Sequence, residues 1–181
     1  MISGNYDGDL VEGVRQGKGI LEWTNSDKYD GDFQNGLRHG RGRYEEKNGR
    51  SYEGGWALSM RDGFGVEEWP NGDRYEGNYE KDKMHGNGMM KTSAGTYEGQ
   101  YKESYKNGLG TMTYKNGCKY EGTWKNNRFH GRAVRWLELS ALGVRERDER
   151  NLHVVFKWNA KQFGDGLLVH QVQGCPCATY A

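Results

Sequence analysis

A tyrosine that returns every 22 or 23 residues is the feature that most constrains how this chain folds. Each of these tyrosines precedes an acidic residue and a glycine, as in Tyr75-Glu76-Gly77. A large, mostly aromatic residue stands four positions after each tyrosine, and another glycine stands eleven positions after it. The six tyrosines are Tyr6, Tyr29, Tyr52, Tyr75, Tyr97 and Tyr120. A fixed period sustained over six copies predicts a repeat array.

The amino-acid composition argues against a single compact globule. Of the 181 residues, 29 are glycine and only 34% are hydrophobic, so glycine takes positions that a compact core would fill with aliphatic side chains. A stack of repeats, in which each copy buries its apolar face against its neighbours, fits this composition better. The 13% aromatic content supplies the large apolar area per residue that a thin sheet needs.

Two kinds of turn alternate along each copy. One contains Asn-Gly, as at Asn71-Gly72 and Asn116-Gly117, and the other is a polar pair such as Asn35-Gly36. Asn-Gly between short runs predicts a hairpin turn in which both central residues have positive φ. The roughly five to seven residues between turns suit strands and are too few for helices. We therefore predict an all-β fold, an elongated single-layer antiparallel meander of six hairpin repeats.

Alternation along a strand places Tyr75, Gly77 and Tyr79 on one face of the predicted sheet. Which residues of the Gly-x-Gly strand share this face is not fixed by the sequence, because a one-residue change in turn length would move them all to the other face. The shorter spacing between Tyr75 and Tyr97 predicts that one residue is missing at the turn near Ala94-Gly95.

The repeat ends near Trp136, so we predict an array over residues 1–136 and a non-repeat segment over residues 137–181. Within this segment Leu152–Trp158 alternates like a strand, and Leu137–Arg150 has the features of a short helix. Three interpretations stay open: an end cap for the array, a helix laid along the aromatic face, or a segment without a stable fold.

The pattern Tyr-Glu-Gly-x-Trp/Tyr, followed by His-Gly-x-Gly and by Asn-Gly before the next tyrosine, resembles MORN repeats. One copy runs from Tyr75 to Gly88, and the resemblance covers residues 6 to about 136, with departures at Leu10 and Ala133. It implies a twisted single-layer sheet without catalysis of its own. Such arrays serve as scaffold or targeting segments in cytoskeletal, ciliary and membrane-associated assemblies, and binding of anionic lipids is also implied.

The aromatic face is the main candidate binding surface. A single-layer sheet has no second layer to cover both faces, so an exposed aromatic strip is expected to dock a helix or an extended peptide of a partner protein. The predicted protein-binding residues are Tyr29, Phe33, Tyr52, Trp56, Tyr75, Tyr79, Tyr97, Tyr101, Tyr120 and Trp124.

The distribution of charge predicts a second surface. The net charge of +1 lacks the basic excess that nucleic-acid binding needs, so no nucleic-acid partner is expected. Residues 99–136, however, carry eight Lys and Arg against two acidic residues. We predict that this basic end contacts an anionic membrane surface. The residues are Lys102, Lys106, Lys115, Lys119, Lys125, Arg128, Arg132 and Arg135.

No catalytic, metal or cofactor site is expected. His39, His85 and His130 occupy the same position in alternate copies, so they would lie about 19 Å apart, too far to share a zinc ion. Equivalent carboxylates would lie about 10 Å apart, beyond the spacing of paired catalytic acids. The glycine pairs lack the third glycine of a dinucleotide fingerprint.

The sequence therefore predicts a non-catalytic scaffold or adaptor that binds a partner protein. The alternatives are a peripheral membrane adaptor that binds phospholipid through residues 99–136, and the targeting segment of an enzyme whose catalytic domain is absent. Because there is no apolar run of about 18 residues and no signal-peptide pattern, we expect an intracellular, cytoplasmic location, at the cytoskeleton, the cilium or the membrane periphery. The oligomeric state stays open.

Overall fold

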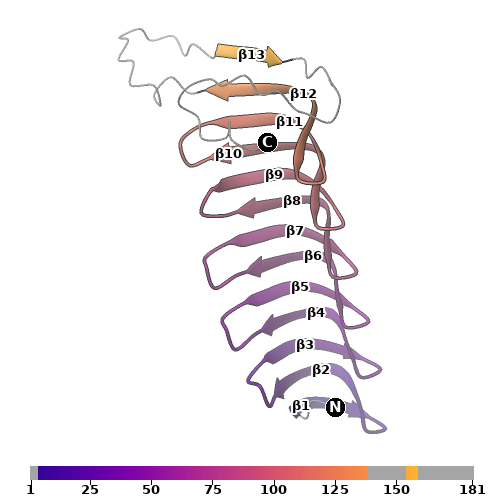
Figure 1. Ribbon diagram of the computed structural model, residues 1–181. Helices are drawn as coiled ribbons and strands as arrows, with labels where there is room; N and C mark the ends of the chain where they lie inside the picture. The colour runs from indigo at the N-terminus through magenta and orange to yellow at the C-terminus, as the bar shows by residue number, and fades with distance from the viewer. Residues whose placement is uncertain (1–3, 138–153, 159–181) are drawn as a thin grey trace, which may run out of the picture.

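The computed structural model describes residues 4–137 and 154–158, which form one open antiparallel sheet (Figure 1). The strands lie in the sheet in their order along the chain, each hydrogen-bonded to the next. Their bounds are β1 Gly4–Val11, β2 Val14–Trp23, β3 Lys28–Gln34, β4 Leu37–Glu45, β5 Ser51–Ala57, β6 Met60–Glu68, β7 Arg74–Glu80, β8 Lys83–Lys91, β9 Gly95–Lys102, β10 Tyr105–Tyr114, β11 Lys119–Lys125, β12 Arg128–Leu137 and β13 Val154–Trp158. The predicted all-β, single-layer meander of hairpin repeats is confirmed.

Tight two-residue turns join the two strands within each repeat. Both central residues have positive φ, as in Asn35-Gly36, at 51° and 79°, and Lys81-Asp82, at 48° and 67°. This backbone matches the right-handed twist of the flanking strands. From the second repeat onward, an amide of each of these turns also bonds the strand of the preceding hairpin. Gly36 N donates to Arg15 O and Ser59 N donates to Arg38 O, each at 2.9 Å, so neighbouring turns form a continuous edge.

The Asn-Gly turns, which join one repeat to the next, differ from the prediction. In the turn Trp69–Asp73 only Gly72 has positive φ, and its N–H donates to Trp69 O at 2.8 Å. The extra residue, Pro70, makes this a longer loop, in which one turn is followed by a single left-handed glycine. The prediction of positive φ at both Asn and Gly was therefore wrong. The missing residue is at the predicted turn, where Thr92 N bonds Gly95 O directly at 2.8 Å.

The spacing of tyrosine and glycine follows from how closely the tyrosine ring lies over the next strand. The Tyr75 ring covers Gly88, where an added Cβ would stand 2.6 Å from the ring Cζ. The ring is held there because its hydroxyl donates to Asn78 O at 3.0 Å. All six anchoring tyrosines make this bond to the carbonyl three residues onward, at 2.9–3.0 Å. In the first five copies the residue under the ring is glycine, whose lack of a Cβ leaves room for the ring, and in the sixth copy this position is Ala133.

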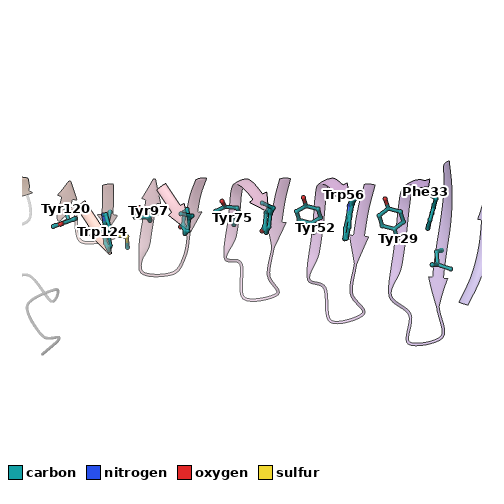
Figure 2. Close-up of a cluster of buried hydrophobic side chains, with 12 residues drawn as sticks. Tyr29, Phe33, Tyr52, Trp56, Tyr75, Tyr97, Tyr120 and Trp124 are labelled. Carbon is teal, nitrogen blue, oxygen red and sulfur yellow. The ribbon is translucent and has the colours of Figure 1, made fainter. Parts of the chain in front are cut away.

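The buried rings form one continuous row, which we call the ladder (Figure 2). The four inner anchoring tyrosines, Tyr29, Tyr52, Tyr75 and Tyr97, each pack edge to face against the aromatic residue of their own strand and against that of the following repeat. Tyr52, for example, lies 5.2 Å from Trp56 and 5.1 Å from Tyr79 between ring centroids. These are favourable aromatic geometries, and they repeat from Tyr6 to Trp124. The core of this protein is therefore one ring thick.

The strand register shows which residues of the Gly-x-Gly strands share the face of the ladder, which the sequence did not fix. Tyr75 pairs with Glu67 across the sheet, and Tyr97 pairs with Met90, so these residues of the Gly-x-Gly strands share the ladder face. The equivalent residues, which we call the cross-strand row, are Leu21, Tyr44, Glu67, Met90 and Met112.

The strand predicted over Leu152–Trp158 is present as β13, which pairs antiparallel with β12. The predicted helix over Leu137–Arg150 lies almost wholly outside the described residues, as do residues 159–181. The three interpretations of the segment 137–181, and the domain boundary at 136, stay predictions.

Candidate protein-binding face

The ten aromatic residues predicted to bind a partner all belong to the ladder, and all of them are buried. The most exposed is Tyr120, at 8%, and Tyr29 and Tyr75 have no exposed surface. The rings therefore form the core of the array. A partner on the ladder face meets mainly the side chains that border and cover the rings.

A row of side chains that the sequence analysis missed lies over these rings. It consists of the residues nine positions after each anchoring tyrosine, which we call the covering row: Arg15, Arg38, Arg61, Met84, Lys106 and Phe129. The Arg38 guanidinium carbon stands 4.2 Å from the Trp56 ring centroid, and the Lys106 amine stands 4.7 Å from that of Tyr97. These are cation–π contacts. A search for cations at the repeat period would have found this row.

The arginines of the covering row are fixed by the turn of the next repeat. Arg15 donates from Nη2 to Gly36 O at 2.9 Å, and Arg38 donates to Ser59 O at 2.8 Å. Burial lowers the pKa of Arg38 and of Lys106, because the charged form loses contact with water. Each of these arginines therefore covers a ring and also ties two neighbouring hairpins together, whereas Lys106 covers rings only.

Glu67 interrupts the otherwise apolar or aromatic cross-strand row with a buried carboxylate. Its side chain is 4% exposed. Oε1 accepts from Arg50 Nε at 2.7 Å and from Arg61 Nη1 at 2.8 Å, and Oε2 accepts from the Tyr79 hydroxyl at 2.6 Å. Burial, followed by the charge of Glu67, raises the pKa of Tyr79. Burial of Arg61 acts to lower its pKa, but Glu67 and Asp82 outweigh it and the pKa is raised. We call this group the Glu67 cluster.

The ladder face is hollowed beside the Glu67 cluster. The hollow has a volume of about 390 Å³, with walls formed by Tyr44, Tyr52 and Trp56. Its cations are Arg38, Arg50 and Arg61, and its acidic residues are Glu46, Glu67 and Asp82. Arg50 and Arg61 form ion pairs with these acids. Among the described side chains no carboxylate oxygen lies within ion-pair distance of Arg38, so this guanidinium is available to a ligand in the hollow.

The next part of the ladder face has different chemistry. Met84 and Met90 take the positions that Arg61 and Glu67 hold one repeat earlier. The Tyr101 hydroxyl, which corresponds to that of Tyr79, is buried and has no hydrogen-bond partner among the described residues. Flexible thioether side chains are typical of surfaces that adapt to a partner.

The structure does not bring the eight predicted lipid-binding residues together. Lys106 covers the ladder, while Lys119 forms an ion pair with Glu121 at 3.7 Å. Lys115 lies in a turn at the opposite edge from Lys102 and Lys125. Lys102, Lys125 and Arg128 do lie close together, beside the two-residue turns of the last two hairpins. Arg132 and Arg135 belong to β12, and their side chains are outside the described part of the chain.

The described residues contain neither a metal-binding cluster nor a membrane-crossing helix. Within residues 4–137 and 154–158, no group of three or more His, Cys, Asp or Glu side chains is arranged to hold a metal ion. The same residues contain no helix of the length and apolarity that a membrane crossing needs.

The chain belongs to the MORN-repeat family. The family model of the MORN repeat matches six segments, residues 6–28, 29–49, 52–74, 75–96, 97–119 and 120–137. The predicted family is thereby confirmed, and each segment begins at an anchoring tyrosine. MORN repeats are generally non-catalytic and occur in protein-binding and membrane-associated scaffolds. No curated protein matches the chain.

Proposed function

We propose that this protein is a non-catalytic scaffold that binds a partner protein on its ladder face. The hollow beside the Glu67 cluster is the observation that supports this most directly. It combines aromatic walls with one cation, Arg38, that has no carboxylate partner among the described side chains. Aromatic and arginine side chains are the residues that dominate protein interfaces.

The partner segment lies across the hollow and extends toward the methionines. Arg38 receives an acidic side chain or a carbonyl of the partner, because its guanidinium carries donors beyond the Nη2 bond to Ser59 O. Met84 and Met90 receive an apolar side chain. The buried rings position all of these groups, which refines the predicted role of the ten aromatic residues.

Site-specific photo-crosslinking in cells tests this proposal. A benzoylphenylalanine replaces Glu46, which lines the hollow, or Glu98, which is exposed on the opposite face. The two substitutions remove the same charge. We expect a discrete covalent adduct from position 46 and none from position 98, and the adduct should be lost when Arg38→Gln is added. Equal adducts from both positions would contradict the proposal.

The membrane alternative has less support, because the predicted basic residues are divided between the two faces of the sheet. Flotation with phosphatidylserine vesicles tests it, and we expect weak association that salt abolishes. Cytoskeletal, ciliary or membrane-peripheral assemblies are the settings in which we expect the partner. Proximity labelling with the full chain and with a chain ending at Trp136 would identify the setting.

A further inference from the structure

A second surface lies on the face opposite the ladder, along the edge formed by the two-residue turns. Each turn is flanked by a pair of residues that face each other across the hairpin, such as Val11 and Val14 in the first repeat. The first residue of each pair follows a ladder residue directly, so the pair projects from the opposite face. Because each turn after the first is bonded to the preceding hairpin, these pairs form one continuous surface, which we call the hairpin stripe.

The hairpin stripe is mainly apolar over the first three repeats. Val11 and Val14 are 58% and 45% exposed, and Leu37 of the second repeat is 40% exposed and pairs with Gln34, the one polar residue of this half. Ala57 and Met60 form the pair of the third repeat. A Cβ added to Gly36, in the second turn, would stand 3.5 Å from Val14 Cγ1, so the second turn lies beside the valines of the first hairpin. Exposed apolar side chains that line up in this way mark an interaction surface.

The same stripe is basic over the last two repeats. Lys102 pairs with Tyr105, and Lys125 pairs with Arg128. All four side chains are exposed, and none of the three cations forms an ion pair with a described carboxylate. Glu80 and Lys83, the pair of the fourth repeat, separate the apolar half from the basic half.

We propose that the hairpin stripe binds an α-helix of a partner protein that is apolar in one half and acidic in the other. The acidic half lies over Lys102, Lys125 and Arg128. This surface is independent of the ladder face, so the array is able to hold one protein on each side.

The geometry of the stripe favours a helix over an extended segment. The stripe runs across the strands, whose backbone groups already bond their neighbours, so an extended segment would leave its own N–H and C=O groups unpaired. A helix satisfies these groups internally. Its residues seven apart are about 10.5 Å apart, close to the repeat spacing of about 10 Å. A helix of about 36 residues has one such position for each of the six hairpins.

A protein helix also fits better than a membrane surface. The apolar and basic groups occupy different ends of the stripe, and among the described side chains the basic end has three cations without an ion-pair partner. A membrane surface docked on those cations would leave the apolar half without a partner, whereas a helix of matching length uses both halves.

A synthetic helix tests the proposal with the full chain. The probe has about 36 residues, with leucine at every seventh position in one half and glutamate at the equivalent positions in the other. Fluorescence anisotropy measures its affinity. The triple variant Lys102→Glu, Lys125→Glu, Arg128→Glu should weaken binding by about tenfold or more, and Val14→Ser with Leu37→Ser should also weaken it clearly.

The matched control makes the same three charge reversals at exposed lysines of the other turn edge, with Lys47→Glu, Lys91→Glu and Lys115→Glu. It should leave the affinity within about twofold. A photoreactive group at the glutamate end of the probe should label residues near Lys102 and Lys125. Arg38→Gln should leave probe binding unchanged, which separates this proposal from the proposed function.

The proposal would be overturned if the probe did not bind, and binding of phosphatidylserine vesicles through the three cations would then identify a membrane surface as the ligand. Equal losses of affinity in the two triple variants would also overturn it. So would labelling near Val14 by the glutamate end of the probe.

Discussion

Two neighbouring parts of the ladder face, one around Tyr79 and the next around Tyr101, have the same ring packing but are covered by chemically different side chains. The rings of Tyr52 and Tyr79 lie 5.1 Å apart, and those of Tyr75 and Tyr101 lie 5.3 Å apart, with the same edge-to-face geometry. The first part is covered by the buried ion pair of Arg61 and Glu67, and the second by two methionines. Repeat-motif residues therefore set the geometry. The covering row and the cross-strand row give each part its own chemistry.

The largest effect should come from the glycines under the rings, and it should be equal in both parts. Gly65→Ala and Gly88→Ala each place a Cβ 2.6 Å from a tyrosine Cζ. Each should lower the free energy of unfolding by about 3 kcal/mol, because the ring has to leave its position. Urea denaturation measures this. In the control Gly72→Ala the new Cβ meets nothing within 4 Å and only backbone strain remains, about 1 kcal/mol. A much smaller loss for Gly88→Ala than for Gly65→Ala would break the comparison.

Transplanting the methionines onto the Glu67 cluster should have the next largest effect. Glu67→Met alone should cost about 2–3 kcal/mol, because Arg50 Nε, Arg61 Nη1 and the Tyr79 hydroxyl lose the acceptor that Glu67 provides. Adding Arg61→Met reproduces the pair found one repeat later, and the double variant should recover part of the loss. A double-mutant cycle from urea denaturation gives the coupling energy. Strict additivity would show that the two side chains do not act as a unit.

Removal of a hydroxyl should distinguish the two parts directly. Tyr79→Phe should cost about 1.5 kcal/mol, because the hydroxyl donates to a buried carboxylate. Tyr101→Phe should cost nothing, because the equivalent hydroxyl is buried without a partner among the described residues. The same denaturation experiment measures both variants. A loss at Tyr101 as large as that at Tyr79 would contradict this reading of the two parts.

The smallest effect should come from restoring a cation over the second part. Met84→Arg places a guanidinium over the rings of Tyr75 and Tyr101, beside Ser104, whose hydroxyl accepts from Met84 N as that of Ser59 accepts from Arg38 N. We expect a gain of about 0.5 kcal/mol, measured as an increase in the urea midpoint. Met84→Gln is the uncharged control and should give no gain.

Part of the candidate site was accessible from the sequence. The anchoring tyrosines and their aromatic partners were predicted as one face, and the structure places them on one face. Their burial was not predicted, because alternation shows which residues share a face but not how closely neighbouring rings pack. The covering row was missed, although it has the same period as the tyrosines.

The sequence by itself determined the meander of hairpins and the spacing of tyrosine over glycine. Both depend on contacts between adjacent strands, and these contacts repeat in every copy, so the period records them. Only the tertiary structure decided that Glu67 faces the ladder, that no described carboxylate lies within ion-pair distance of Arg38, and that Lys102, Lys125 and Arg128 share one edge. These outcomes depend on register and on turn geometry, in which a difference of one residue moves a side chain to the other face. The longer loop around Gly72 is the case in which local sequence signals gave the wrong geometry.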